Sequence, residues 1–591
     1  MRTPGRRSWR AALAVGLLTA TVPAPAASAE ITVGPASVIG RWGAPFEEGG
    51  PTAPACVESD GRAVCKPVAQ ALGVLPDGRL LYFDGSSGGE GEARLLDLRS
   101  GGPVWSTPGG TDPGLLGADV ASLGEGRLLV AGGAGRRTRL YDPATDRFTP
   151  AGPMRLGRRY PVAVTLPDGR VMVAGGAPQE AGGAPDQAAG AGARHVGPTE
   201  IFDPATGAWA DAGSGPGSEA ALPLSPHLHL MPNGKVLYTA VGESAFPAAA
   251  DATADEALYP LLRFFDPDRG RWDVVGADTL GVRDGAGTVL LALDPPYDHA
   301  TVLTFGGALG PPPSSAVGTS LVTETDVDRS GHLKERKTRW EMRGGRWNPS
   351  GVVLPDGAVL AVGGAGTSET AAPGAGLPAR TAELFDPTTE QWSPMAAANR
   401  DHTYGQSAVL LPDGRVLLGG HAPPAAPGPE PAAPAPGAPE PALGEGLPQR
   451  ARDASFEIFS PYYLFRGPRP VITYVNPSVQ YLQRFNIFTT DAADITTVAL
   501  VRNPSATHLV DGDQRTVDVP IVSRTTKSVT VAIPSNTVLP PGPYMLFVNR
   551  GTASGEIPSV SRQVFVGGPV PASLAPRLAR RTTTETAAES R

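Results

Sequence analysis

Six copies of one phrase constrain this 591-residue chain more than any other feature of its sequence. They read "LPDGRLLYFDG", "LGEGRLLVAGG", "LPDGRVMVAGG", "MPNGKVLYTAVG", "LPDGAVLAVGG" and "LPDGRVLLGG". In each phrase a tight turn ending in glycine joins two apolar strands, which predicts a β-hairpin. A divergent copy, "GTVLLALDPPYDHATVLTFGG", lies between the fourth and fifth clear copies, so we count seven units. The turn aspartates serve turn geometry in this interpretation: Asp77, Asp168, Asp356 and Asp413.

Most units continue with an aromatic-Asp-Pro phrase, such as "YDPATDRF" or "FDPTTEQW", that closes a further strand pair. Repeats of four short strands with Gly-Gly at the end of the second strand resemble kelch repeats. That resemblance implies sheets arranged as blades in a closed ring, which hides every sheet edge. We therefore expect an all-β fold, with a seven-bladed kelch-type β-propeller at residues 67–465. After it, β-branched alternation in "TTVALVRN" and "SVTVAIPS" predicts an immunoglobulin-like, early-set β-sandwich at 466–567.

The remaining segments differ in composition from these two domains. The cationic start, the short apolar run "AALAVGLLTATV" and the "ASA" before Glu30 are typical of a cleaved export signal, so we expect a secreted protein. Arg6-Arg7 leaves the twin-arginine route open beside the general one. The complete expected order is a signal peptide at 1–29, an N-terminal segment at 30–66, the propeller with a Pro/Ala-rich insertion at 419–450, the sandwich, and a disordered tail at 568–591.

Charge and cysteine content exclude several classes of function. The formal net charge is -8 and basic residues are scattered, which argues against a nucleic-acid partner. No apolar stretch reaches the length of a membrane span. The chain has two cysteines, Cys56 and Cys65, and in an oxidising compartment these are expected to form a disulfide. Free thiols or metal ligands are the alternative, and no third cysteine is left for chemistry.

Residues that stand the same number of positions before each hairpin turn are expected to lie at the same depth along the central channel of a propeller. Seven residues before the turn proline, or its Gly124 equivalent, the clear copies present Gly117, Tyr160, Ser225, Asn348 and Gly405. Tyr404 stands one residue earlier in the last copy. We therefore expect Tyr160 and Tyr404 to enter the channel mouth from different blades, where propellers usually bind their ligands.

After the repeats the chain continues with "ATHLVDGDQRTVDVP" and "PPGPYMLFVNRGTASGEIPSVSRQVFV". Together with the repeats, these segments resemble the galactose oxidase and glyoxal oxidase family of copper radical oxidases. The resemblance extends over nearly the whole chain after the leader. The resemblance implies a copper cofactor and the oxidation of an alcohol or aldehyde by O2, with hydrogen peroxide as product. It implies that His508 is an equatorial ligand, Tyr404 an axial ligand and Tyr160 the radical-bearing ligand.

Two family residues are replaced in this sequence. Gly405 stands where the family has a second histidine ligand, and Gly117 stands where it has the cysteine joined to the radical tyrosine. Copper(II) favours tetragonal nitrogen and oxygen donors, so the loss of an imidazole weakens the site. The lost thioether makes one-electron oxidation of Tyr160 harder. Three other histidines are alternative ligands by strand spacing: His402, His227 and His229.

Two functions of different class follow from these residues. The first is a secreted propeller that lacks full copper-radical activity and binds an extracellular glycan or partner. The alternative is an active copper oxidase of an alcohol or small aldehyde, favoured by the intact "ATHLVDGDQR" and both tyrosines. The sequence names neither the substrate nor the oligomeric state, because specificity in such folds depends on rim loops.

Overall fold

The computed structural model describes residues 34–578 of the chain with several gaps. The gaps are 51–55, 60–61, 85–92, 111–113, 116, 134, 180–194, 244–258, 282, 310–313, 327–331, 370–375, 422–451 and 576. The expected signal peptide at 1–29 and nearly all of the Pro/Ala-rich insertion therefore lie outside the described residues. Within the described residues, no helix is long and apolar enough to cross a membrane.

Seven antiparallel sheets of four strands form the larger part of the described chain, and two of these sheets gain a fifth strand. The first holds β4 (Ala71–Val74), β5 (Leu80–Phe83), β6 (Arg94–Asp97) and β7 (Val104–Ser106). The second holds β8 (Ala118–Ser122), β9 (Leu128–Gly132), β10 (Thr138–Asp142) and β11 (Arg147–Pro150). The third holds β13 (Val162–Thr165), β14 (Val171–Ala174), β16 (Glu200–Asp203) and β17 (Ala208–Asp211).

The other four sheets repeat this pattern along the chain. The fourth holds β18 (Leu228–Leu230), β19 (Val236–Tyr238), β21 (Leu261–Asp266) and β22 (Arg271–Ala277). The fifth holds β23 (Arg283–Leu290), β24 (His299–Leu309), β25 (Ser320–Asp326) and β26 (Leu333–Lys337), with β20 (Val241–Gly242) beside β23. The sixth holds β27 (Ser350–Val353), β28 (Val359–Val362), β29 (Thr381–Asp386) and β30 (Gln391–Ala397). The seventh holds β31 (Ser407–Leu410), β32 (Val416–His421) and β33 (Asp453–Ser460), closed by β1 (Arg41–Trp42).

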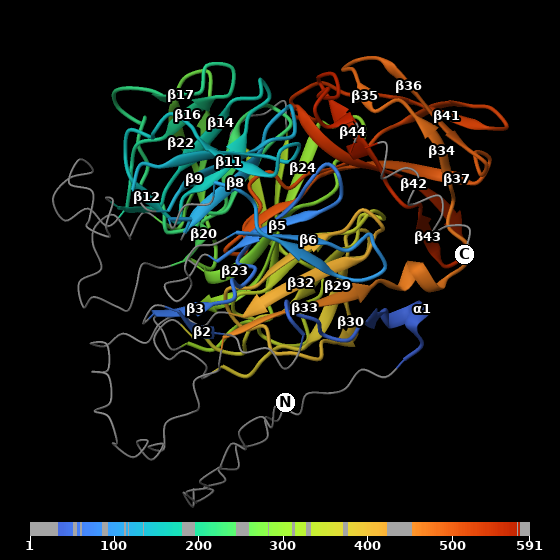
Figure 1. The fold of residues 1–591 in the computed structure, drawn as a ribbon, viewed down its shortest axis with the longest axis horizontal. Helices are drawn as coiled ribbons and strands as arrows, with labels where there is room; N and C mark the ends of the chain where they lie inside the picture. The colour runs from blue at the N-terminus through green and yellow to red at the C-terminus, as the bar shows by residue number, and fades with distance from the viewer. Residues whose placement is uncertain are drawn as a thin grey trace, which may run out of the picture. The chain divides into compact units, whose positions relative to one another are not determined.

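The first strands of successive sheets contact one another and bring the last sheet back to the first. Contacts join β4 to β8, β8 to β13, β13 to β18, β23 to β27, β27 to β31, and β31 to β4. Hydrogen bonds from His227 and His229 to Thr288 join the fourth sheet to the fifth. Figure 1 shows the blue strands β5 and β6 beside the yellow to orange β32 and β33. The described residues thus form the seven-bladed propeller that the repeats predict.

Hydrogen bonds within the hairpin turns explain the repeated "PDGR". In the first blade Asp77 accepts hydrogen bonds from the backbone and the side chain of Arg79, at 3.2 and 2.8 Å. Asp168 and Asp413 make the same pair of bonds to the arginine two residues later. The glycine between them takes positive φ, +86° at Gly78, which an L-residue adopts only with strain. These aspartates therefore stabilise turns, as the sequence predicts.

A buried arginine joins the strands within two of the blades. Arg158 pairs with Glu200 at 2.9 Å and donates to the carbonyl oxygen of Gly175 at 3.0 Å. Arg346 repeats both contacts with Glu383, at 2.9 Å, and with Gly363, at 3.3 Å. In each case the glycine is the first of the Gly-Gly pair. The first glycine of each pair thus supplies a backbone carbonyl that accepts a hydrogen bond from the buried arginine, which also binds the glutamate of another strand.

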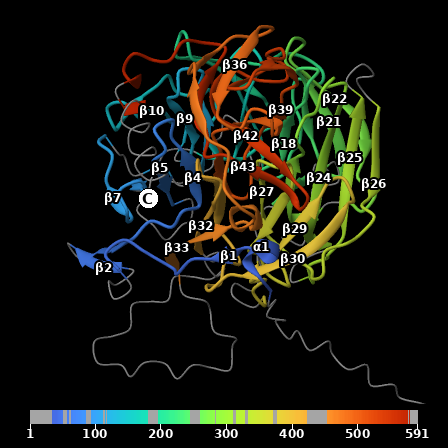
Figure 2. The ribbon, with the colours of Figure 1, turned by 90° about the vertical axis from the view of Figure 1, so that its right-hand side faces the viewer.

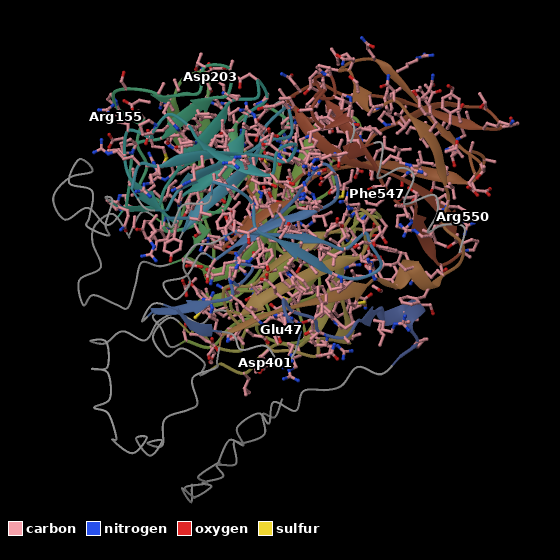
Figure 3. The ribbon with its side chains drawn as sticks, viewed as in Figure 1. Glu47, Arg155, Asp203, Asp401, Phe547 and Arg550 are labelled. Carbon is pink, nitrogen blue, oxygen red and sulfur yellow. The ribbon has the colours of Figure 1, made fainter. Side chains whose placement is uncertain are left out.

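The C-terminal domain is a sandwich of two sheets. One holds β34 (Ile472–Val475), β36 (Arg484–Thr489), β41 (Ser528–Ala532) and β40 (Ile521–Arg524). The other holds β35 (Ser478–Val479), β44 (Arg562–Val566), β42 (Gly542–Thr552), β37 (Ile495–Arg502), β39 (Thr516–Asp518) and β43 (Gly555–Pro558). Figure 2 views the molecule from the side of these strands, with β24–β26 of the fifth blade at one edge. The sandwich core continues into the propeller: Phe547, labelled in Figure 3, packs with residues of the last two blades.

The sandwich also sends one segment into the propeller. Its strand β38 (Ser505–Thr507) pairs with β4 as an extra strand of the first blade. Further along this segment, the buried Asp513 accepts hydrogen bonds from the backbone of Ser122 at 3.0 Å and of Thr165 at 2.7 Å. The hydrogen bonds of Asp513 to two neighbouring blades and the pairing of β38 with β4 hold the segment at both ends. His508 lies between these two anchors in the sequence, so its position is fixed.

Two expected boundaries differ from the structure. The segment at 30–66 was expected to lie outside the propeller, but β1 completes the last blade, because an outermost strand from the N-terminus closes the ring. The tail was expected to be disordered from 568. Instead Leu574 is buried, and Arg577 pairs with Asp146 at 3.0 Å, so the packed chain continues to 578. The burial of Leu574 and the ion pair of Arg577 with Asp146 hold this part of the tail against the protein despite its polar composition.

The remaining short elements lie outside these sheets. They are α1 (Ala36–Ile39), η3 (Tyr462–Phe465), the hairpin of β2 (Cys56–Ser59) and β3 (Arg62–Cys65), and the pair of β12 (Arg158–Arg159) and β15 (Ala177–Pro178). In the hairpin Cys56 lies opposite Cys65, and Cys65 is disulfide-bonded. The chain contains no other cysteine, so Cys56 is its partner.

Candidate functional site at the channel mouth

Residues with positive φ mark the start of six blades, the second to the seventh. Five positions chosen by their offset from the turns share this backbone conformation: Gly117 (+69°), Tyr160 (+60°), Ser225 (+44°), Asn348 (+62°) and Gly405 (+63°). The fifth blade has no PDG turn, and there Gly285 (+57°) takes the same conformation. Backbone hydrogen bonds run between neighbours in this set, for example from Tyr160 to Gly117 at 2.8 Å.

Tyrosine, serine and asparagine rarely adopt this conformation without a structural reason. Here the reason is the hydrogen bond from one blade to the next, because Ser225 donates to Tyr160 at 2.9 Å and Asn348 to Gly285 at 2.7 Å. Strained backbone of this kind concentrates at functional sites. His508 also has positive φ, +46°, at the tip of the sandwich segment. The strained residues of both domains therefore meet at the channel.

The structure brings Tyr160 and His508 together. Their rings meet edge to face with centroids 4.7 Å apart, and the guanidinium of Arg159 lies 4.9 Å from the centroid of the Tyr160 ring. Burial raises the pKa of the Tyr160 phenol, and the positive charge of Arg159 partly opposes this effect. Tyr160 is thus a neutral phenol at neutral pH in the protein alone.

Tyr404 lies on the other side of this site. Its hydroxyl donates to a carboxylate oxygen of Glu243 at 3.3 Å, and its ring stacks on Trp347 with centroids 5.4 Å apart. Burial and the neighbouring carboxyl of Glu243 raise the pKa of Tyr404 well above its usual value. The Tyr160 phenol is close enough to act in the same direction. Tyr160, Tyr404 and Glu243 therefore face one another across the channel mouth.

Glu243 and Asp284 are site residues that the sequence analysis missed. Burial, together with the charge of Asp284, raises the pKa of Glu243 to about 8. Asp284 accepts hydrogen bonds from the indole of Trp347 at 2.9 Å and from the hydroxyl of Ser368 at 3.3 Å. A carboxyl whose pKa is raised by burial and by a neighbouring carboxyl is a candidate functional group.

A signal for both residues exists in the sequence. Asp284 immediately precedes Gly285, so it occupies the same position in its blade as Arg159, Trp347 and Tyr404 do in theirs. The divergent fifth copy has no PDG turn from which to count. Glu243 follows "YTAVG", where the other clear copies end in Gly-Gly or, in the first, in Asp-Gly. This departure from the repeat is the sequence feature that distinguishes Glu243.

The three alternative histidines have other partners. His402 contacts the carbonyl oxygen of Gly420 at 2.8 Å and Glu457 at 3.3 Å, which are the contacts that buried arginines make in other blades. The rings of His227 and His229 share the hydroxyl of Thr288, at 2.7 and 2.9 Å. Burial lowers the pKa of both rings to about 3, so they are neutral. These histidines stabilise the blades through hydrogen bonds.

The positions of the two replaced ligands can be tested against this geometry. A Cβ atom at Gly117 would lie 3.1 Å from Cε1 of Tyr160 and 3.2 Å from its Cδ1, so the place for a sulfur against the ring is present. Arg159 Cγ would be 2.7 Å away and would have to move. Neither Gly117 nor Gly405 supplies a donor atom from a side chain.

The donor set does not fit the copper centre that the family resemblance implies. The site offers one imidazole where that centre needs two. The Tyr404 hydroxyl, which would have to bind the metal, donates a hydrogen bond to Glu243 instead. Among the residues that the structure describes, no three His, Cys, Asp or Glu side chains are grouped to hold a metal ion. Any ion here would need the phenols as ligands.

Comparison with known proteins supports the resemblance. The family described as Galactose oxidase-like, Early set domain matches residues 469–566. The chain is 27% identical to an "Aldehyde oxidase GLOX" of Vitis pseudoreticulata over 71% of this chain and 76% of the relative. It is 26% identical to a "Galactose oxidase" of Gibberella zeae over 89% of this chain and 71% of the relative.

A solved structure has the same fold. It is described as a novel fungal alcohol oxidase with catalytic diversity among the AA5 family, in complex with copper, and it matches with a TM-score of 0.66 at 21% identity. The match covers 89% of this chain and 99% of that chain. The chain is therefore similar over most of its length to a galactose oxidase and to an aldehyde oxidase, and residues 469–566 of its C-terminal sandwich match the galactose oxidase-like early-set domain.

Proposed function

We propose that this protein is a secreted homologue of the copper radical oxidases that binds a hydroxylated ligand, a glycan or a glycan-bearing partner, without copper-radical turnover. The observation that carries the proposal is the changed set of donors: Gly117 and Gly405 provide no sulfur or imidazole, and Tyr404 donates to Glu243. Without the sulfur, oxidation of Tyr160 to a radical is harder. Without the second imidazole, copper(II) loses a strong ligand.

The remaining groups suit a ligand rich in hydroxyl groups. Glu243 presents a carboxyl group and Arg159 a guanidinium, and both residues are partly exposed. They come from different blades, so a ligand that bridges them would be held from two sides. The leader-like start of the chain and the disulfide at Cys65 support an oxidising, extracellular location.

The test combines a turnover assay with a binding assay on the purified protein. Peroxide formation is measured with glyoxal, methylglyoxal and galactose after incubation with copper(II), and sugar binding is measured on a glycan array. We expect no peroxide above the background of a Tyr160→Phe variant, and glycan binding that Glu243→Ala abolishes. The exposed Glu341→Gln is the matched control and should leave binding unchanged. Peroxide production at a copper-dependent rate would contradict the proposal.

An active copper oxidase is a second candidate, and one observation favours it. A Cβ atom at position 117 would lie 3.1 Å from Cε1 of Tyr160, so this position still adjoins the ring, although Arg159 would have to move. If the site is active, the unmodified protein should bind one copper ion and oxidise an aldehyde or alcohol. The same peroxide assay decides between the two candidates.

A further inference from the structure

A small cavity lies where the sandwich meets the fifth, sixth and seventh blades. Residues of β23, β27 and β31, one strand from each blade, line it together with sandwich residues between 501 and 516. Tyr160, Tyr404 and His508 do not line it, so this cavity is separate from the channel mouth. Its volume is about 40 Å³, which is room for roughly three water molecules. A cavity between two domains is a common place for a small ligand.

Four side chains that line this cavity have polar atoms without a hydrogen-bond partner among the described residues. The atoms are Oγ of Ser350, Oγ1 of Thr516, Nε of Arg502 and Nη1 of Arg515. The exposed fraction of each of these four residues is 4% or less. All four atoms can donate a hydrogen bond, and a buried donor without an acceptor is costly. In native proteins such groups usually bind an ordered water or an ion.

The acceptors in the same lining are engaged elsewhere. The carboxyl of Asp511 accepts hydrogen bonds from the backbone N–H groups of Ser505, at 3.0 Å, and of Asp513, at 3.1 Å. The side-chain amide of Gln514 exchanges two hydrogen bonds with the backbone of Leu290, at 2.8 and 3.0 Å. The acceptor for the four donors therefore has to come from outside the chain.

The charges around the cavity favour an anion as this acceptor. Arg515 donates to the carbonyl oxygen of Leu230 at 2.6 Å, and no carboxylate of the described residues forms an ion pair with it. Its neighbour Arg502 has one carboxylate partner, Asp513, at 3.5 Å. Burial raises the pKa of Asp511 to about 7, so at neutral pH this carboxyl offsets only part of a charge. An excess of buried positive charge is left, and an anion would remove its cost.

The size of the cavity and the size of this excess select among anions. A chloride ion is only slightly larger than a water molecule, so it fits the volume. It accepts several hydrogen bonds and donates none, which matches a lining of four donors. Sulfate and phosphate are larger, and each carries more negative charge than the unpaired guanidinium of Arg515 can offset.

We propose that Ser350, Arg502, Arg515 and Thr516 form a site for a chloride ion between the sixth blade and the sandwich. The ion accepts hydrogen bonds from the two hydroxyls and the two guanidinium groups, and its charge offsets that of Arg515. Because these donors come from both domains, the bound ion stabilises the contact between them. The inference goes beyond the proposed function and does not depend on it.

Thermal unfolding of the purified full chain tests the site. Potassium gluconate, whose anion is too large for the cavity, is replaced stepwise by potassium chloride at constant ionic strength. We expect the melting temperature to rise by at least about 1 °C and then to level off, because a ligand that binds only the folded state stabilises it. Bromide should act in the same way. Equal melting temperatures in gluconate and chloride would overturn the proposal.

Crystals grown in bromide locate the ion. Anomalous scattering at the bromine absorption edge should give a peak within hydrogen-bond distance of Nη1 of Arg515 and Oγ1 of Thr516. Ordered water in the cavity with no anomalous peak would overturn the proposal, because the four donors would then be satisfied without an anion.

Three variants connect the effect on stability to these side chains. Arg515→Met should lower chloride affinity at least about tenfold, because it removes the unpaired charge. Thr516→Val removes one hydroxyl at nearly constant volume and should also weaken the chloride dependence. Arg484→Met, which changes an exposed arginine of the sandwich, is the matched control and should leave it unchanged.

Circular dichroism establishes that each variant is folded. A folded Arg515→Met protein with the chloride dependence of the unmodified chain would overturn the proposal. If Arg515→Met does not fold, Thr516→Val decides: a weaker chloride dependence supports the site, and an unchanged one refutes it.

Discussion

The buried arginine of the sixth blade gives a sharp test of how the blades are stabilised. Arg346 and Glu383 are almost completely buried, with side chains 3% and 2% exposed. In the Arg346→Met variant, Glu383 keeps one strong partner, the backbone N–H of Arg343 at 2.9 Å. The carbonyl groups of Gly363 and Ala379, both at 3.3 Å from the guanidinium, also lose a donor.

The expected loss is large for a single substitution. Removing one partner of a buried ion pair costs about 3–5 kcal/mol, because the other charge stays buried. The surface pair Arg170–Asp168, with side chains 40% and 50% exposed, is the matched control. Arg170→Met should cost less than about 1 kcal/mol, because solvent screens that pair.

Urea unfolding followed by tryptophan fluorescence measures both variants beside the unmodified protein. We expect Arg346→Met to lower the free energy of unfolding several times more than Arg170→Met does. Arg158→Met, which removes the equivalent pair with Glu200, should match Arg346→Met. Equal and small effects for all three would refute the reasoning, since the repeated Arg–Glu contact would then contribute no more than a surface pair.

Three further predictions concern pH, the segment at 505–513 that the sandwich sends into the propeller (the plug), and the lost ligands. Burial raises the pKa of Asp119 and of Asp511 to about 7, against about 3.9 in an unfolded chain. The folded state therefore holds protons that the unfolded state releases, and the free energy of unfolding should fall as pH rises from about 4 through 7. Asp119→Asn should reduce this fall in urea titrations at pH 5 and pH 8, and a stability that rises over this interval would contradict it. Asp513→Ala leaves Arg502, its partner at 3.5 Å, buried without that carboxylate, so the melting temperature should drop clearly. An unchanged melting temperature would show that the plug is held by other contacts. The double variant Gly117→Cys, Gly405→His should retain copper at least about tenfold better in equilibrium dialysis, and no gain would mean that the channel differs beyond these two positions.

The repeats were sufficient to predict the propeller, because a hairpin phrase with a required positive-φ glycine recurs at regular spacing. The offset from the turns also identified positions that share one backbone conformation, including the unusual Tyr160 and Asn348. These features could be predicted because the geometry of a turn depends on only a few neighbouring residues and agrees with the overall fold.

Contacts between distant segments could not be predicted in the same way. The pairing of β1 with β33 and the contact of Arg577 with Asp146 join residues that are far apart in the sequence. Asp284 lies in the fifth copy, where the offset rule has no turn to count from, and Glu243 follows the fourth copy, which ends in Val-Gly where other copies end in Gly-Gly. The departures from a repeat are therefore the places to search for site residues.

We infer that the site around Tyr160, Tyr404 and His508 does not hold the copper centre that the family resemblance implies. Copper content after incubation with copper(II) and extensive dialysis tests it most directly, measured by mass spectrometry with electron paramagnetic resonance of the same sample. The account predicts far less than one copper per chain and no signal of a tetragonal centre. One copper per chain with a tetragonal spectrum that disappears in His508→Ala would contradict it.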